Sequence, residues 1–262
     1  MSLAQTLLSK IADRAEAAQR GARAITKFTD EFPEMTVEDG YAVQDELRRR
    51  ALARGERLVG FKAGLTSKAK MKQMGVDSAS IGFLTNDGFR PEGSAIAVAE
   101  LIHPRVEAEV AFVTKEALRG PGCTREQVLA ATDFVLPAVE IIDSRFEKFR
   151  FDLPSVLADN TSAARYVAGG RPRDPRDLDL ATLGVVLEKN GEIVALAASA
   201  AVLGHPAEAV AMVVNHLAAR GETLAAGSFV MSGGITEAIA VAAGDHITAR
   251  IQHLGSVSMR FV

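Results

Sequence analysis

Cysteine is almost absent from this sequence: Cys123 is the only one among 262 residues, and there is no tryptophan. A single thiol excludes an internal disulfide and any metal cluster built from cysteines, which favours a reducing compartment. We therefore expect a cytoplasmic protein. Residues 1–25 also lack a long apolar block behind a basic one, so we expect an amphipathic helix there rather than an export signal.

Long apolar runs and an excess of positive charge are missing as well. No run approaches the roughly 20 residues of a membrane-spanning helix, so no membrane partner is expected. The net charge of −3 and the lack of a basic stripe with interleaved aromatics argue against a nucleic-acid partner. With 48% hydrophobic residues the chain is of the globular type, and we expect one domain over residues 1–262.

Several common catalytic motifs are also missing. None of the histidines stands at a metalloprotease spacing; they are His103, His205, His216, His246 and His253. No Gly-x-Ser-x-Gly elbow occurs, and neither a dinucleotide-binding glycine motif nor a Walker A loop is present. Serine hydrolase and zinc peptidase chemistry are therefore disfavoured, and nothing supports a nucleotide cofactor.

The front of the chain is predicted to be helical. A first helix is expected to end near Gly21, and a second to begin after Thr36, where Asp39 completes the pattern of a capping box. Gly55 is a suitable C-terminal stop for this second helix. Both helices are expected to lie at the periphery of the fold.

The rest of the chain favours strands, because its apolar runs are short and broken by Gly, Pro, Asn and Asp. Asn190-Gly191 between two β-rich runs predicts a tight hairpin turn. One more helix is expected over 205–221, and further strands over 228–262. Residues 171–179 are charged and are interpreted as a solvated loop. The pattern predicts an α+β chain with mostly antiparallel strands.

The segment "HPRVEAEVAFV", residues 103–113, has the alternation of a half-buried β-strand. One face would carry the apolar side chains, which are Val106, Ala108, Val110 and Phe112. The other face would carry Glu107 and Glu109, beside Arg105, about 7 Å apart. Like charges at this separation repel each other unless a positive group lies between them.

A third acid stands in a comparable setting, because Glu140 interrupts the apolar run of "VLPAVEIIDSR". Three carboxylates without a thiolate suit a hard divalent cation such as Mg²⁺ or Mn²⁺. The alternative is that Glu107 and Glu109 form surface salt bridges with Arg105 or a neighbouring strand. Spacing alone leaves the two interpretations open.

Long motifs in order along nearly the whole chain resemble the fumarylacetoacetate hydrolase superfamily. They are "GFKAGLTSKAKMKQMGV", "HPRVEAEVAFV", "VLPAVEIIDSR", "ADNTSAARYVAGG" and "GSFVMSGGITEAIAVAAGDHI". The nearest branch contains the hydratases and decarboxylases of aromatic meta-cleavage pathways. The resemblance implies a mixed β-roll, with a helical region over residues 1–58 and a core with the metal site over residues 59–262.

The resemblance also implies the site residues. Glu107, Glu109 and Glu140 match the Mg²⁺ ligands of the family, with Mn²⁺ as a substitute and no organic cofactor. Lys62 matches a lysine used near the substrate; the alternative for Lys62 is surface solvation, although Phe61 and Ala63 on either side disfavour full exposure. The positions that match substrate contacts are Leu65, Ser162 and Thr236.

The activity implied by the resemblance is a choice within the branch. Hydratases carry an aspartate where this chain has Ser80, and "SGGIT" resembles the decarboxylases. The resemblance therefore favours a carboxy-lyase that converts the dicarboxylate 2-oxo-3-hexenedioate to 2-hydroxypenta-2,4-dienoate and CO₂. The alternative is a hydratase of that product.

Association with other chains is left open by the sequence. Family members with the two activities associate, so a complex with the dienoate hydratase and a homo-oligomer both remain open. A third interpretation is a non-catalytic partner subunit of that hydratase. It is disfavoured because such a subunit would not need four charged groups: Lys62, Glu107, Glu109 and Glu140.

Overall fold

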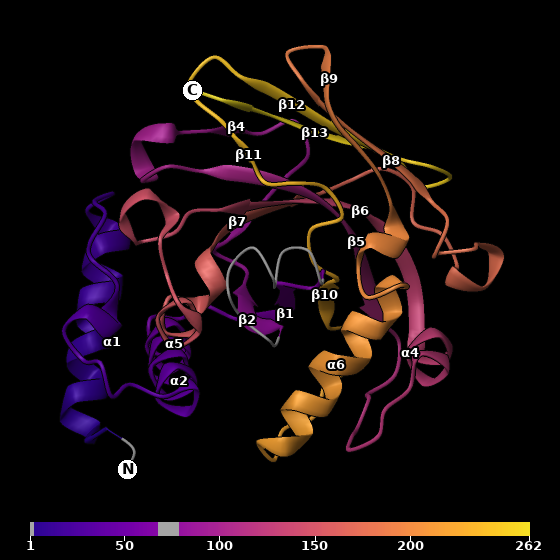
Figure 1. Ribbon diagram of the computed structural model, residues 1–262. Coiled ribbons are helices and arrows are strands. Elements are labelled where there is room, and N and C mark those ends of the chain that lie inside the picture. Colours follow the sequence, from indigo (N-terminus) through magenta and orange to yellow (C-terminus); the bar gives the residue numbers. More distant parts are fainter. Residues whose placement is uncertain (1–2, 68–78) are drawn as a thin grey trace.

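The computed structural model describes residues 3–67 and 79–262 (Figure 1). Residues 68–76 of the motif that begins at Gly60 therefore lie outside the described residues. The helices are α1 (Gln5–Arg20), α2 (Val37–Ala53), α4 (Arg125–Ala131), α5 (Leu153–Ala158) and α6 (Pro206–Ala219). None of the described helices is long and apolar enough to cross a bilayer.

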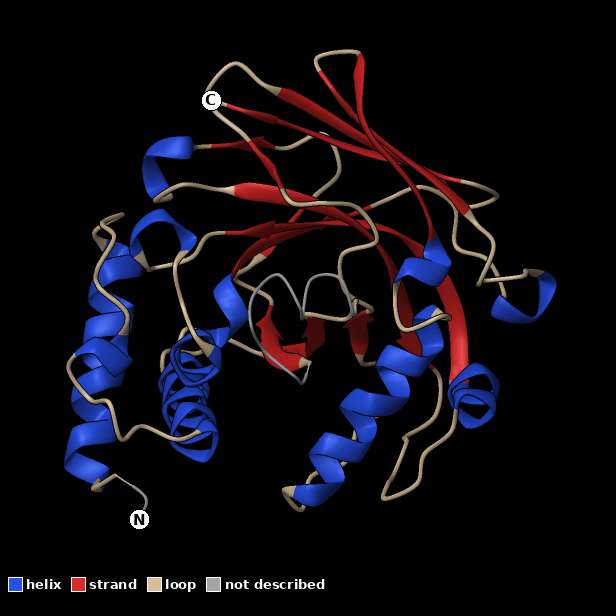
Figure 2. Cartoon of the chain, in the orientation of Figure 1, coloured by secondary structure: helices blue, strands red, loops and turns tan. Residues whose placement is uncertain are grey.

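The strands form two sheets that lie one above the other, with the helices outside them (Figure 2). The larger sheet has the order β2 (Ser80–Thr85), β1 (Leu58–Gly64), β10 (Phe229–Met231), β5 (Arg105–Thr114), β6 (Thr132–Ile142), β7 (Ala163–Ala168) and β3 (Phe89–Arg90), and β11 (Ile239–Ala240) also pairs with β5. The smaller sheet has the order β4 (Ala95–Ile96), β13 (Gly255–Phe261), β12 (His246–Ile251), β8 (Gly184–Lys189) and β9 (Glu192–Ala198).

The predicted helices are confirmed. Gly21 ends α1, and a capping box between Thr36 and Asp39 begins α2, because each supplies the acceptor for the other's backbone N–H. Pro206 opens α6 at its first position. The strands are mostly antiparallel, and the turn between β8 and β9 contains Asn190-Gly191, so the α+β expectation holds.

Two short helices, α4 and α5, escaped the sequence analysis. They have seven and six residues, which is too short for an apolar period to be recognised. Both have clear N-terminal signals: Thr124 and Gln127 form a capping box before α4, and Asp152 caps α5. Local capping chemistry could have predicted them where periodicity could not.

Strand β5 is buried on both faces, so the expectation of a half-buried strand is wrong. This burial decides where the site lies. Val106, Ala108, Val110 and Phe112 are fully buried in the main core, which also includes Ile247, Ala249, Val257 and Met259 of the smaller sheet. The opposite face of β5 carries Glu107 and Glu109. The larger sheet curls so that β1, β2 and β10 lie beneath β5 and β6, between α5 and α6 (Figure 1). The carboxylates therefore point into the concave side of that sheet.

A close backbone approach in this curl joins β1 to β10. These strands pair in parallel, with Gly60 opposite Phe229. A side chain at Gly60 would collide with the Phe229 backbone, since a Cβ built there would lie only 2.7 Å from the Phe229 carbonyl carbon. Glycine at this position thus lets β1, which carries Lys62, join the sheet.

We expect Gly60→Ala to lower the free energy of unfolding by about 3 kcal/mol or more, because the added methyl group must push β1 away from β10. Chemical denaturation followed by circular dichroism measures this. The control is Gly184→Ala in β8, where the nearest atom to an added Cβ is 3.6 Å away and stability should stay within about 0.5 kcal/mol. Equal stability of the two variants would contradict the packing explanation.

Candidate metal centre

Three glutamates converge on the concave face of the larger sheet. Glu107 lies directly opposite Glu140 in the antiparallel β5–β6 pair, and Glu109 is two residues further along β5. One carboxylate oxygen from each can be chosen so that all three lie within 4.8 Å of one another. Glu109 and Glu140 are at most 1% exposed and Glu107 is 8% exposed. The interpretation as surface salt bridges is therefore wrong.

The carboxylate oxygens are only partly satisfied by the described part of the chain. The backbone N–H of Gly233 donates to Glu109 Oε2 at 2.7 Å. Glu109 Oε1 and Glu140 Oε2 accept no hydrogen bond from any described residue. Buried oxygens of this kind cost free energy unless a donor or a cation approaches them. Three converging carboxylates with unused lone pairs fit a hard divalent ion such as Mg²⁺.

Without a metal, the electrostatics of the cluster favour the protonated, neutral forms of Glu109 and Glu140. Burial raises the pKa of Glu109 well above its usual value, and the charges of Glu140 and Glu107 raise it further. Burial also raises the pKa of Glu140, while the neighbouring Lys62 ammonium opposes that rise. A divalent cation would reverse this balance, because it stabilises the ionised forms.

Lys62 lies beside the cluster and not on the surface, so the surface-solvation alternative is wrong. The residue is 2% exposed, and Nζ lies 3.1 Å from Glu140 Oε1. Nζ also donates to the Thr161 carbonyl oxygen at 3.0 Å. Gly82, opposite Lys62 on β2, leaves room for this side chain, because a Cβ there would lie 3.1 Å from Lys62 Cδ. The ammonium group is thereby held between a backbone dipole and a carboxylate.

The loop that supplies the Thr161 carbonyl has an unusual backbone. Asn160, Thr161 and Ser162 all have positive φ, between 48° and 57°, a region that costs side-chain-bearing residues free energy. The Asn160 side chain compensates, since Oδ1 accepts from the Phe83 N–H at 2.9 Å and Nδ2 donates to the Phe83 carbonyl at 3.0 Å. This double hydrogen bond ties the loop to β2 and so positions the acceptor of Lys62.

The three predicted substrate contacts occupy different settings. Thr236 Oγ1 accepts from the N–H of Ala108 at 3.1 Å, between the two glutamates of β5. Ser162 Oγ donates to Asp159 Oδ2 at 3.0 Å within its own loop. Leu65 directly follows β1 with a φ of 56° and is partly exposed. Thr236 thus contacts the backbone that carries the carboxylates. The substrate-binding roles of Leu65, Ser162 and Thr236 stay predictions.

Gly233 is a contributor that the sequence analysis missed. Its N–H orients Glu109, and its φ of 102° is one that side-chain-bearing residues rarely adopt. A Cβ at this position would also collide with the Thr66 side chain. The only sequence signal was the pair of glycines in "SGGIT", which does not say what either glycine contacts.

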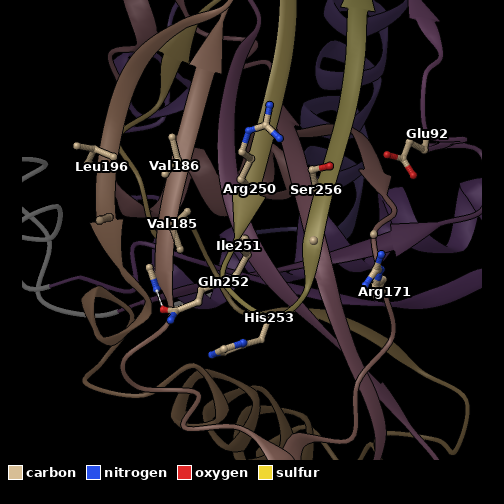
Figure 3. A pocket seen from close by; sticks show the side chains of 14 residues that line it. Glu92, Arg171, Val185, Val186, Leu196, Arg250, Ile251, Gln252, His253 and Ser256 are labelled. Atoms are coloured by element: carbon tan, nitrogen blue, oxygen red, sulfur yellow. Dashed lines mark hydrogen bonds between the residues drawn. The ribbon is translucent and has the colours of Figure 1, made fainter.

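A hollow lies elsewhere, against the smaller sheet (Figure 3). This cavity of about 890 Å³ is lined by residues that include Val185, Val186, Leu196, Arg250 and Ile251. Glu92 is the one acid among its lining residues. This hollow therefore lacks the converging buried acids that mark the candidate metal centre.

Comparison with known proteins agrees with this geometry. Residues 59–262 match the family model described as fumarylacetoacetate (FAA) hydrolase C-terminal. The chain is 57% identical over 252 residues to 4-oxalocrotonate decarboxylase of Pseudomonas sp. (strain CF600), covering 96% of each protein. It is 42% identical over 246 residues to 2-hydroxyhexa-2,4-dienoate hydratase of Comamonas testosteroni, covering 93% of each.

A solved structure extends the agreement to the whole fold. The 4-oxalocrotonate decarboxylase from Pseudomonas putida G7, complexed with magnesium and adipate, superposes with a TM-score of 0.97. It is 53% identical in sequence, and the match covers 100% of this chain and 99% of that one. The expected β-roll with peripheral N-terminal helices is thereby confirmed.

The raised pKa values predict how Mg²⁺ stabilises the fold as the pH changes. Because the folded, metal-free protein favours neutral Glu109 and Glu140, its stability should fall as the pH rises above their usual value of 4.5 toward the raised values. Mg²⁺ binds the ionised forms, so the gain in Tm on adding Mg²⁺ should grow between about pH 5 and pH 8.

Thermal unfolding with and without Mg²⁺ measures this gain at each pH. In Glu109→Gln the dependence on pH should be flatter, because one titrating ligand is gone. A gain in Tm that is the same at every pH would contradict the buried acids as the ligands.

Proposed function

We propose that this chain, which belongs to the fumarylacetoacetate hydrolase family, is a divalent-metal-dependent 4-oxalocrotonate decarboxylase. The reaction converts 2-oxo-3-hexenedioate to 2-hydroxypenta-2,4-dienoate and CO₂. The observation that carries the proposal is the buried cluster of Glu107, Glu109 and Glu140 with Lys62 against it. The similarity to decarboxylases over nearly the full chain supports the choice of reaction.

The three glutamates would hold the metal, for which we propose Mg²⁺, with Mn²⁺ as a substitute. The donor set supports this assignment, because hard divalent ions prefer carboxylate oxygens. When bound, the ion supplies a Lewis acid for the oxygens of the 2-oxo acid. No organic cofactor is needed for this reaction.

The substrate itself explains how carbon dioxide can leave. Its distal carboxylate is a vinylogue of a β-keto acid, so the electron pair of the breaking C–C bond can move through the 3,4 double bond to the 2-oxo oxygen. Negative charge therefore grows on that oxygen while the departing carboxylate loses its charge. Groups that stabilise the oxygen more strongly in the transition state than in the substrate accelerate the reaction.

We propose that Lys62 stabilises the negative charge that develops on the 2-oxo oxygen. Its ammonium is buried next to Glu140, on the same concave face as Glu107 and Glu109, so it can face the charge that develops on the substrate. The Thr161 carbonyl holds Nζ in place before the substrate arrives. In a site from which water is largely excluded, a positioned charge of this kind is worth more than in solution.

A hydratase is the alternative activity, and two observations disfavour it. Identity to the hydratase of Comamonas testosteroni is 42%, against 57% to the decarboxylase. Ser80 also offers a neutral hydroxyl, not a carboxyl group, for proton transfer to a diene. We therefore propose a lyase that releases the dienol as its product.

The wider setting of the enzyme follows as a further part of the proposal. Residues 1–262 would form one catalytic domain, because α1 contributes Leu8 and Ile11 to the same core as the sheets. The substrate is a small dicarboxylate, and a cytoplasmic location suits it. We also propose a complex with the dienoate hydratase, which would pass on the dienol, while a homo-oligomer and a purely supporting role for this chain are the alternatives.

We expect Glu107→Gln to lower Mg²⁺ affinity and turnover by more than about 100-fold with the fold intact, because a charged ligand is replaced by a neutral one. Calorimetric titration gives the affinity, and CO₂ release from 2-oxo-3-hexenedioate gives the turnover. Full activity of this variant after chelator treatment would overturn the metal assignment. Consumption of 2-hydroxypenta-2,4-dienoate by the native enzyme without CO₂ release would identify a hydratase.

Lys62→Ala should keep Mg²⁺ binding and depress kcat by about 100-fold, because only the charge opposite the developing enolate is lost. Steady-state kinetics with a parallel Mg²⁺ titration separates the two effects. The control is Lys189→Ala, which should leave the kinetics unchanged. Lys189 lies on β8 of the smaller sheet and pairs with Asp245, outside the metal centre. Unchanged kinetics of Lys62→Ala would remove Lys62 from the mechanism.

A further inference from the structure

Besides Ser232 Oγ, three hydroxyl groups around the cluster are buried without a hydrogen-bond partner in the described part of the chain. They belong to Thr66, Ser80 and Thr161, which are 1%, 0% and 5% exposed. A buried hydroxyl without a partner costs roughly 1–3 kcal/mol, so native proteins supply a water or a ligand to such groups. Three of them around one site therefore point to a ligand with several acceptor oxygens.

Ser80 lies at the Lys62 side of the site. In the antiparallel β1–β2 pair, Ser80 is opposite Gly64 and Gly82 is opposite Lys62, so these four residues share one face. A Cβ placed on Gly64 would lie 2.7 Å from Ser80 Oγ and 3.5 Å from Lys62 Nζ. The absence of a side chain at Gly64 thus leaves the hydroxyl and the ammonium next to the same small space.

Thr161 borders the same space with its methyl group, and Thr66 lies next to the glycine that contacts Glu109. The Thr161 methyl carbon would be 2.6 Å from a Cβ on Gly64, and the Thr161 carbonyl is the acceptor of Lys62. Thr66 packs against Gly233, whose N–H donates to Glu109. Ser80 and Thr161 therefore lie next to Lys62, and Thr66 lies near the partner of Glu109.

We propose that Thr66, Ser80 and Thr161 bind the oxygens of the 1-carboxylate and 2-oxo groups of the substrate. This proposal rests on the proposed function and adds the residues that recognise the metal-chelating end. The choice of end follows from the reaction: donors at the departing carboxylate would stabilise the substrate more than the transition state, in which that charge is disappearing. Donors at the 2-oxo oxygen gain strength as charge accumulates there.

Neutral donors suit this place for a second reason. The site already contains three carboxylates and one ammonium, so another acid would repel the substrate and another cation would compete with the metal. A hydroxyl can donate to the enolate oxygen without changing the net charge of the site. Ser80, Thr66 and Thr161 would thereby select a planar 2-oxo acid over a simple carboxylate.

The test uses oxalate as the probe, because it is planar and has the paired oxygens of the chelating end without a departing carboxylate. In Ser80→Ala, Thr66→Val and Thr161→Val, the Kd for oxalate at saturating Mg²⁺ should rise about tenfold, which corresponds to one lost hydrogen bond to a charged group. Mg²⁺ affinity should stay within about twofold of the native value. With 2-oxo-3-hexenedioate, the loss should appear in kcat more than in KM.

Two sets of variants separate binding from a structural role. Thr66→Ser and Thr161→Ser keep the hydroxyl and should keep most of the oxalate affinity. Thr248→Val and Ser258→Ala remove hydroxyls from a cross-strand pair in the smaller sheet and should change nothing. If Ser80→Ala does not fold, Ser80→Cys, which has nearly the same shape and a weak donor, should show the same weakening of oxalate binding.

Three results would overturn the proposal. The first is an oxalate affinity that stays native in all three variants that lose a hydroxyl. The second is a weaker binding of adipate with native binding of oxalate, which would place the hydroxyls at the far end of the substrate. The third is a loss of oxalate affinity in the serine variants that is as large as the loss in the valine variants. The proposed function fails separately if the native enzyme binds oxalate with Mg²⁺ but releases no CO₂.

Discussion

The pairing of Glu107 with Glu140 across β5 and β6 is the constraint on which the rest of the structure depends. Two carboxylates opposite each other in a buried sheet repel, and Glu109 adds a third within reach of both. The fold accepts this cost because the two strands are the centre of the larger sheet and their other faces are deep in the core. The sheet therefore fixes the backbone positions from which the carboxylates project. That rigidity is what a preorganised metal site requires.

The neighbours of the acids all limit this repulsion. Lys62 supplies a positive charge, the Gly233 N–H supplies a dipole, and the carboxylate oxygens without a hydrogen-bond partner remain for a cation. The position of Lys62 depends on two glycines. Gly60 lets β1, which carries Lys62, approach β10, and Gly82 makes room for the Lys62 side chain. The glycines in this part of the chain are thus requirements of the charged site, and not only of the turns. Stability and chemistry share the same residues here.

The site also explains why the backbone strain at residues 160–162 is tolerated. Consecutive positive φ values present the Thr161 carbonyl to Lys62, and the Asn160 amide fixes the loop on β2. A lysine with its acceptors already in place loses little freedom when a substrate binds. The proposed mechanism relies on this positioning, since charge on the substrate oxygen has to meet a cation that is already oriented.

The sequence by itself determined the alternation of β5, the capping of α1 and α2, the hairpin at Asn190-Gly191 and the three acidic candidates, because each depends on neighbours within a few residues. It left the metal site and surface salt bridges equally open until the resemblance was considered. Only the tertiary structure decided that the acids are buried, that Lys62 reaches Glu140, and that Ser162 donates to Asp159 while the hydroxyls of Thr66, Ser80 and Thr161 lack partners. Burial and hydrogen-bond partnership depend on segments that lie about a hundred or more residues apart, and no local pattern specifies which of them meet.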